Sequence, residues 1–377
     1  MKKIGLYIHI PFCVQKCHYC DFNSYAGISY MKDQYTHAMI EEMKLYKEKN
    51  SDIEVGTIFI GGGTPTCLEA PLLEDILISC RELFELTEDC EISIESNPGT
   101  LTKEKLRMLK QNGVNRLSIG LQCWDDLQLK RLGRIHSKDQ FVENYHSARE
   151  EGFDNINIDL MFSLPDQTLQ QWERTLHQVI QLMPEHISCY ALKIEEGTRF
   201  YQDYQNKKLQ MPDEDVDRDM YEAAIKMLIS NDYSHYEISN FAKRGYECKH
   251  NLLYWKSKEY QGIGAGAHSY INAIRYANIK SPEEYIKRIK GNLLPVEEEE
   301  QLAVKDQMSE FMFLGLRLIG GVNSSEFYQR FGVELDDIYE EELNKLIALS
   351  LIEAHKYGYK LTRRGIDLSN QVFMEFI

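Results

Sequence analysis

Long hydrophobic runs are missing from this 377-residue sequence. No apolar stretch approaches the roughly 18 residues that a membrane-spanning helix needs. The opening segment turns polar at His9 and carries Gln15 and Lys16 soon afterwards, so it lacks the uninterrupted core of a signal peptide. We therefore expect a cytoplasmic protein with at most peripheral membrane contact.

Positive charge is also scarce. The chain has 43 basic and 59 acidic residues, which gives a formal net charge of -16. Such a balance repels phosphate backbones and anionic lipid, and it argues against a nucleic-acid partner. The segment "LIEAHKYGYKLTRRGIDLSN" near the end predicts a helix, a small hairpin and a final helix, a winged-helix-like pattern. In so acidic a chain, this pattern favours packing or protein contacts over DNA binding.

A disulfide framework is not expected either. The chain has nine cysteines, an odd number, and shows no export signal. A reducing compartment, with thiolates free to bind metal, is the simplest expectation.

The order of elements predicts an α/β fold. Six strand-like runs alternate with amphipathic helices, which implies a parallel sheet with right-handed crossovers. The expected strands are Ile4–Ile10, Thr57–Ile60, Glu91–Glu95, Arg116–Leu121, Asn155–Met161 and His186–Leu192. The expected helices are Tyr30–Lys49, Leu72–Phe84, Lys103–Asn112, Lys138–Glu151, Leu169–Leu182 and Asp213–Ser230. Six such units can form an open doubly wound sheet or a partial barrel, and periodicity does not choose between them.

The pattern changes after about residue 235. A connecting segment over 236–280 contains the Gly-rich stretch "QGIGAGAHSY", and helices dominate from Pro282 onward. We expect a barrel or sheet domain over 1–235 and a C-terminal, mainly helical domain over 281–377. The run Glu297–Glu300 is expected to begin a solvated helix.

Three cysteines, Cys13, Cys17 and Cys20, lie within eight residues just after the first strand. So tight a group is rarely incidental. One interpretation is a structural zinc site completed by His18 or His9. Another is a [4Fe–4S] cluster held by three irons, whose fourth iron stays open to another ligand.

Polar residues recur where the later strands end. "GGGTPT" follows the second strand and allows close approach of a ligand, while Glu95, Gln122 and Asp159 lie near the ends of the next three strands. A buried polar group without a partner costs about 1–3 kcal/mol. Because strand ends of parallel α/β folds build the functional site, these residues suggest one shared ligand.

The C-x3-C-x2-C spacing after a first strand resembles the signature of the radical S-adenosylmethionine (SAM) superfamily. "YIHIPFC", "GGGTPT", "ISIESNP", "RLSIGLQ" and "NIDLMFSLP" are similar to one branch, the oxygen-independent coproporphyrinogen III oxidases and their relatives. The resemblance implies a partial (β/α)6 barrel and a [4Fe–4S] cluster on the three cysteines. It also implies a set of SAM-binding residues, namely Tyr7, Tyr19, Gly62, Gly63, Thr64, Glu95, Gln122, Arg134 and Asp159.

Two departures set the chain apart from the oxidases of that branch. They carry a further cysteine in a C-x-C pair, where this chain has Cys20-Asp21-Phe22, and an N-terminal extension that this sequence is expected to lack. "CDFNS" and "HNLLYW" (His250–Trp255) instead resemble the heme chaperones of the branch. That resemblance implies heme binding by His250, delivery of heme to respiratory hemoproteins, and a possible homodimer.

Alternatives stay open at this point. The chain could be a radical SAM oxidative decarboxylase of coproporphyrinogen III, or a zinc-bound interaction module. By its chemistry alone, His250 suits a hydrogen-bonded loop histidine, and Cys248 is a second possible ligand. His268 is expected to border the SAM pocket. The other cysteines are expected to be buried structural thiols, namely Cys67, Cys80, Cys90, Cys123 and Cys189.

Overall fold

Six parallel strands form the centre of the computed structural model, which describes residues 1–50 and 52–377. They lie side by side in chain order, as the sequence predicts. Side chains on both faces of these strands are largely buried, as in β6, where every residue is buried; this pattern is typical of parallel sheets. The six strands are β1 Lys2–Ile10, β4 Ile53–Gly62, β5 Glu85–Ser96, β6 Arg116–Gln122, β7 Ile156–Phe162 and β8 His186–Ala191.

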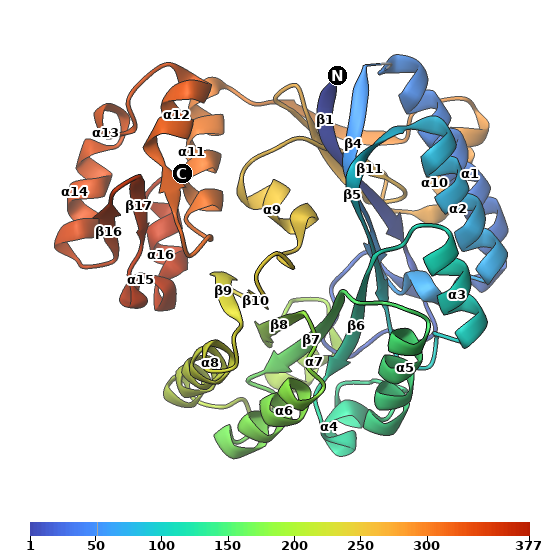
Figure 1. Ribbon diagram of the computed structural model, residues 1–377, viewed down its shortest axis with the longest axis horizontal. Helices are drawn as coiled ribbons and strands as arrows, with labels where there is room; N and C mark the ends of the chain where they lie inside the picture. The colour runs from blue at the N-terminus through green and yellow to red at the C-terminus, as the bar shows by residue number, and fades with distance from the viewer. Residues whose placement is uncertain (51) are drawn as a thin grey trace.

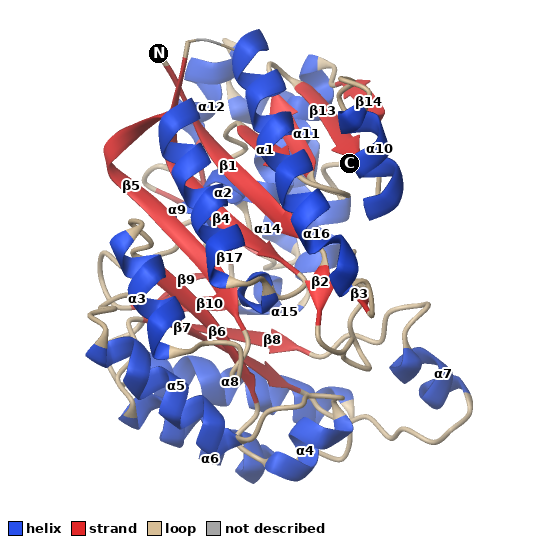
Figure 2. Cartoon of the chain, turned by 90° about the vertical axis from the view of Figure 1, so that its right-hand side faces the viewer, coloured by secondary structure: helices blue, strands red, loops and turns tan. Residues whose placement is uncertain are grey.

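The strands curve into a partial barrel. β1 pairs with β11 (Tyr260–Ile263) and β8 pairs with β10 (Asn240–Ala242), so the first and sixth strands do not meet. Helices cover the outer surface of the curved sheet (Figure 1, Figure 2). These helices are α1 Lys32–Lys49, α2 Ala70–Leu83, α3 Lys103–Gln111, α5 Lys138–Glu150, α6 Leu169–Gln181 and α8 Glu214–Ile229.

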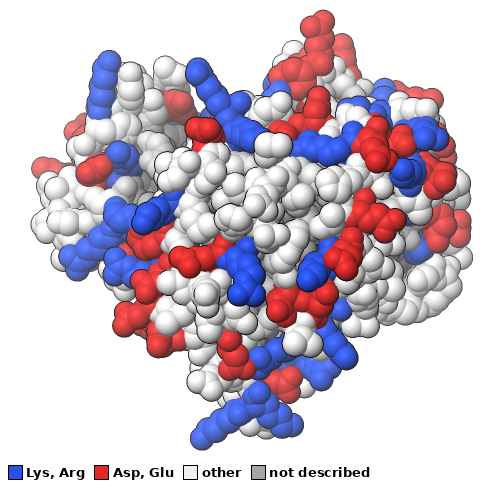
Figure 3. Space-filling view, turned by 60° about the horizontal axis from the view of Figure 1, so that its bottom comes forward, with Lys and Arg blue, Asp and Glu red and all other residues white. Residues whose placement is uncertain are grey.

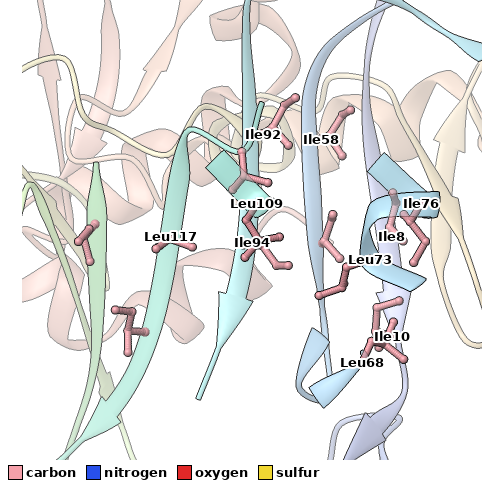
Figure 4. Packing of buried hydrophobic residues seen from close by; sticks show 14 of the residues in the cluster. Ile8, Ile10, Ile58, Leu68, Leu73, Ile76, Ile92, Ile94, Leu109 and Leu117 are labelled. Atoms are coloured by element: carbon pink, nitrogen blue, oxygen red, sulfur yellow. The ribbon is translucent and has the colours of Figure 1, made fainter. Parts of the chain in front are cut away.

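The main core lies between the sheet and these helices. Ile8 of β1 lies next to Ile76 of α2, Ile10 lies next to Leu68, and Ile94 of β5 lies next to Leu109 of α3 (Figure 4). Full burial of a Leu or Ile side chain contributes about 1.5–3 kcal/mol. The core therefore holds the sheet rigidly beneath the loops that leave its strand ends.

The sheet continues beyond β11, and there the structure corrects one expectation. β12 His268–Ile271, β13 Ile274–Asn278 and β14 Val296–Gln301 extend it with antiparallel pairing. Glu297–Glu300 therefore belong to a strand and not to a helix start, although they are exposed as expected. β13 supplies their backbone partners through pairs such as Arg275 with Glu300. Charged side chains on such an edge strand discourage further pairing.

A second, mainly helical unit follows β14 and has its own hydrophobic core around Met312, Phe327 and Leu346. It contains a hairpin near the end, as expected, whereas its likeness to a winged helix remains a prediction. In Figure 1 this unit lies to one side of the barrel, with α9 (Lys249–Trp255) between them. Its elements are α11 Val304–Gly315, β15 Val322–Asn323, α12 Ser324–Phe331, α13 Leu335–Ile338, α14 Glu340–Ala348, β16 Ile352–His355, β17 Gly358–Leu361, α15 Arg363–Asp367 and α16 Ser369–Met374.

Short elements occupy the connections. They are β2 Phe12–Cys13, β3 Tyr25–Ala26, α4 Asp126–Arg131, α7 Arg199–Gln205, β9 Ser234–Glu237 and α10 Pro282–Lys290. Within the part of the chain that the structure describes, no helix is long and apolar enough to cross a membrane. On the face in Figure 3, basic and acidic side chains alternate around an uncharged centre.

Candidate functional site

The cysteine loop follows β1 and is fastened at both ends. β2 pairs with β3 and closes the loop, while Gln15 donates to the Gly133 carbonyl at 2.9 Å. The backbone N–H of His18 donates to the Leu132 carbonyl, also at 2.9 Å. These bonds tie the loop to the turn that follows α4, so the position of the thiols is set by two distant parts of the chain.

All three thiols are half-buried and each has a polar neighbour. The Sγ of Cys13 lies 3.7 Å from the Thr64 hydroxyl, and that of Cys20 lies 3.9 Å from the Ser24 hydroxyl. Arg134 Nη1 lies 3.5 Å from the Sγ of Cys17. Burial raises the pKa of Cys13 and of Cys20. The guanidinium beside Cys17 supplies the positive charge that a group of thiolates requires.

Both histidines of the zinc alternative are engaged elsewhere. The ring nitrogens of His18 lie 2.9 Å from the Arg131 carbonyl and 3.0 Å from Arg199 Nη1. Those of His9 lie 3.0 Å from the Tyr7 hydroxyl and 2.8 Å from the Asn23 carbonyl. Among residues 1–50 and 52–377, no three His, Cys, Asp or Glu side chains converge on one ion position. A [4Fe–4S] cluster needs a different arrangement, because each thiolate binds its own iron.

The glycine segment after β4 packs directly on the cysteine loop. The N–H of Gly63 donates to the Ile10 carbonyl and that of Thr64 to the Phe12 carbonyl, both at 2.8 Å. A Cβ at Gly63 would lie 2.7 Å from the Phe12 oxygen and 3.0 Å from the Cys13 sulfur. Gly62 has φ of +111°, which favours glycine. These glycines are therefore needed for the close approach of two loops.

A chain of hydrogen bonds joins Cys13 to Cys17, and its central residue was not predicted. Asn97 donates to Thr64 Oγ1 at 2.8 Å and accepts from Arg134 Nη2 at 2.7 Å. Arg134 also donates to the Gly120 carbonyl. Asn97 comes two residues after Glu95 in "ESNPGT", so its place just beyond a strand end was the available signal.

One donor in this hydrogen-bonded chain has no partner among the described residues. Arg134 Nε is buried without a hydrogen bond in the described residues. Gln122, at the end of β6, brings its amide near the same place, since a Cβ at Gly120 would lie within 2.9 Å of both side chains. A narrow cleft here is lined by Cys17, Thr64, Asn97 and Arg134. An unpaired guanidinium N–H beside the thiols fits an anionic ligand group such as a carboxylate.

Two carboxylates, Glu95 and Asp159, occupy the barrel interior. Glu95 accepts from the Gly62 N–H at 3.1 Å, and Asp159 accepts from Ser118 at 2.6 Å. Burial, and then the charge of Asp159, raise the pKa of Glu95 to about 8. Burial and Glu95 likewise raise the pKa of Tyr7. Two neighbouring acids in the barrel interior favour a cationic ligand group.

The remaining predicted residues lie at the edges of this group. The ring of Tyr19 packs 6.5 Å from that of Phe200 on α7, and burial raises its pKa while Arg134 opposes the shift. His268 is exposed on β12. Of the five cysteines expected to be buried, four are, and Cys67 is half-buried with its thiol directed at the Phe12 carbonyl.

His250 is fully buried against the barrel interior. Its Nδ1 lies 2.8 Å from the Thr57 hydroxyl and its Nε2 lies 2.8 Å from the Tyr254 hydroxyl. Its ring stacks on Phe59 with centroids 5.3 Å apart. Burial and the charge of Arg116 lower the pKa of His250 to about 3, so the imidazole is neutral. Both nitrogens are engaged, and iron coordination by His250 requires at least one of these bonds to open.

The start of α9 is held by a buried carboxylate. Glu91 accepts from the N–H groups of Lys249 at 3.0 Å and His250 at 3.1 Å, and the Cys248 thiol lies 3.6 Å from it. Burial raises the pKa of Cys248 to about 12. At the other end, the guanidinium of Arg317 covers the Trp255 ring at 4.4 Å. The helix that bears His250 is thus fastened to both the barrel and the C-terminal unit.

Comparison with known proteins agrees with this geometry. Residues 7–179 match the Radical SAM superfamily and residues 302–368 match the HemN C-terminal domain. A solved structure titled coproporphyrinogen III oxidase (HemN) from Escherichia coli superposes with a TM-score of 0.86. It covers 100% of this chain and 90% of its own, and its 24% identity shows the fold alone. The partial barrel with a three-cysteine loop is therefore that of a radical SAM protein.

Closer relatives specify the family. Heme chaperone HemW of Bacillus subtilis is 40% identical over 98% of both chains. HemW of Lactococcus lactis is 37% identical over 100% of this chain and 98% of its own. HemW of Escherichia coli is 35% identical over 100% of this chain and 99% of its own. This chain belongs to the HemW family of heme chaperones.

Proposed function

We propose that this protein is a cytoplasmic heme chaperone that holds a [4Fe–4S] cluster on Cys13, Cys17 and Cys20. The proposal rests on one observation above others, the hydrogen-bonded chain from Thr64 through Asn97 to Arg134 that connects the surroundings of two thiols. When bound, such a cluster would supply an electron and an iron able to bind SAM. The protein's own contribution is to hold the thiols half-buried and to place a positive charge beside them.

The SAM site would extend from this cleft into the barrel. Arg134 Nε would donate to a carboxylate, because it is the one nitrogen of that guanidinium without a hydrogen-bond partner in the described residues. Glu95 and Asp159 would receive the cationic part of the ligand or its ribose hydroxyls. Tyr7, Tyr19, Gln122 and the Gly62–Thr64 segment complete the proposed set.

Heme would bind through His250 after α9 changes its contacts. In the closed arrangement the Nε2 of His250 bonds Tyr254, and opening one such bond costs about 0.5–1.5 kcal/mol. A neutral imidazole is the form that coordinates iron, and burial maintains it. Release to respiratory hemoproteins would follow the reverse movement. We further propose that the protein can form a homodimer and requires no nucleic acid.

Anaerobic reconstitution tests the whole proposal. We expect roughly four iron and four sulfide per chain, heme binding in a titration, and no protoporphyrinogen from coproporphyrinogen III in the presence of SAM and reductant. Cys80→Ala, which removes a buried thiol on α2, is a matched control for loss of a thiol outside the site. Material without iron and sulfide would refute the cluster, and formation of protoporphyrinogen would establish a decarboxylase.

A further inference from the structure

We propose that a pocket at the opposite end of the barrel binds the carboxylate-bearing edge of a metalloporphyrin. We call it the α9 pocket. It has a volume of about 770 Å³ and is lined by the starts of β1 and β4, by α9 and the loop after it, by the β12–β13 turn, and by α11 and α12. The inference rests on the proposed heme-binding function and adds a location and a set of contacts.

The volume and the apolar part of the lining of the α9 pocket suit a large apolar ring. Pockets for cofactors of this size usually measure about 300–1,000 Å³. Ile4 and Leu253 provide apolar side chains, and Tyr270 adds an aromatic ring. The alkyl chain of Lys3 lies across Gly56, where a Cβ would come within 2.2 Å of its Cε. Part of the wall therefore consists of backbone and hydrocarbon, and polar and charged side chains line the rest.

Positive charge gathers around this apolar wall. Lys3, Lys249, Lys258 and Arg330 line the pocket, in a chain whose net charge is -16. Its one acidic residue, Glu259, is paired with Lys2. Porphyrins related to heme carry two carboxylates on one edge of an apolar macrocycle, which is the complementary pattern.

The four basic side chains differ in how far they are already paired with other residues. Lys249 lies 2.8 Å from Asp89, and Lys3 lies 3.9 Å from the same residue. Arg330 donates to the Ser257 carbonyl at 3.1 Å and to the Tyr270 hydroxyl at 3.0 Å. The side chain of Lys258 is exposed and makes no hydrogen bond or ion pair with residues 1–50 and 52–377. Lys258 is therefore the first candidate for a ligand carboxylate.

A buried hydroxyl provides a second, independent sign of a ligand. Ser257 is 6% exposed, and its Oγ has no hydrogen-bond partner in the described part of the chain. Buried hydroxyls are normally paired, and Ser257 lies in the pocket wall between Arg330 and Lys258. After rotation of the side chain into the pocket, this hydroxyl would donate to a bound carboxylate.

The α9 pocket adjoins the proposed heme ligand and is distant from the cluster. Thr57 lines the pocket and bonds His250 Nδ1 at 2.8 Å, so the imidazole lies directly behind the wall. Thr57 and Gly62, which lies at the cysteine loop, are five positions apart on β4, and this corresponds to about 17 Å. A porphyrin in this pocket would thus contact the helix that carries His250 without touching the SAM site.

The test measures porphyrin binding by the anaerobically reconstituted protein. Zinc protoporphyrin IX, followed by fluorescence anisotropy, is compared with its dimethyl ester, which lacks the two charges. We expect Lys258→Glu to weaken binding of the diacid about fivefold, and Lys258→Gln to weaken it less. Lys256→Glu makes the same charge change two residues away, outside the pocket, and should leave the affinity within about twofold. The ester should bind more weakly and be insensitive to Lys258→Glu.

Equal affinities for Lys258→Glu and Lys256→Glu would overturn the pocket, as would laurate displacing the porphyrin at equal concentration. A parallel titration with heme separates this proposal from the proposed function. If Lys258→Glu does not change the affinity for heme, the proposed pocket is refuted and the proposed chaperone function is not. If the native protein does not bind heme but binds zinc protoporphyrin IX in a charge-dependent way, the chaperone function is refuted and the pocket is supported.

Discussion

Replacing Glu95 by glutamine should change the number of protons released when SAM binds. The pKa of Glu95 is raised to about 8, first by burial and then by Asp159. At pH 7, a carboxyl with that pKa is about nine-tenths protonated. If the cationic part of SAM lies beside it, the ionised form is favoured and the proton leaves. Native protein should release up to about 0.9 proton more per SAM than Glu95→Gln at pH 7, falling to about 0.1 at pH 9.

The same residue predicts a pH dependence of stability without ligand. Because the folded pKa lies above the ordinary value of 4.5, the unfolded chain binds fewer protons between pH 4.5 and 8. Stability from this group is present below that window and is lost as pH rises through it. Glutamine keeps an oxygen for the Gly62 N–H and does not ionise. Glu95→Gln should therefore melt higher than native protein at pH 8, with a smaller difference at pH 5.

Calorimetry of SAM binding in two buffers of different ionisation enthalpy gives the number of protons released. Subtracting the number for Glu95→Gln from that for the native protein removes the protons that come from the SAM amine. Thermal melting of apoprotein across pH 5–8 checks the second part. Equal proton release by native and Glu95→Gln protein would refute a cationic ligand beside Glu95. A melting difference that does not grow with pH would refute its raised pKa.

The other predictions concern the cluster and the heme ligand. Cys17→Ala should abolish the broad visible absorption of the cluster and leave the far-ultraviolet circular dichroism of the barrel unchanged; retained absorption would exclude Cys17 as a ligand. Asn97→Ala removes the link between Thr64 and Arg134 and should weaken SAM binding about tenfold with cluster content retained, as measured by equilibrium dialysis. His250→Ala should weaken heme binding without loss of iron and sulfide, and unchanged affinity would remove His250 from the site. Tyr254→Phe frees Nε2 of His250 and should tighten heme binding about two- to tenfold, whereas weaker binding would show that Tyr254 itself contacts heme.

Much of the fold follows from local patterns. The alternation of six buried strands with amphipathic helices predicts the parallel sheet, and each predicted strand overlaps an observed one. Thr168 and Gln171 illustrate the reason, since their capping box begins α6 through bonds within four residues. The prediction of a helix start at Glu297–Glu300 is wrong for the opposite reason. Their strand depends on β13, a partner more than twenty residues away, and not on any local preference.

The sequence by itself determined the three-cysteine loop and the strand-end residues, because ligand spacing and buried strands are local properties of a chain. Tertiary structure alone decided that Asn97 joins Thr64 to Arg134 and that both nitrogens of His250 are already bonded. The α9 pocket also depends on tertiary structure, because its lining residues range from Lys3 to Arg330 in the sequence. Contacts between residues so far apart depend on how the helices and strands pack, and no short stretch of sequence contains that information.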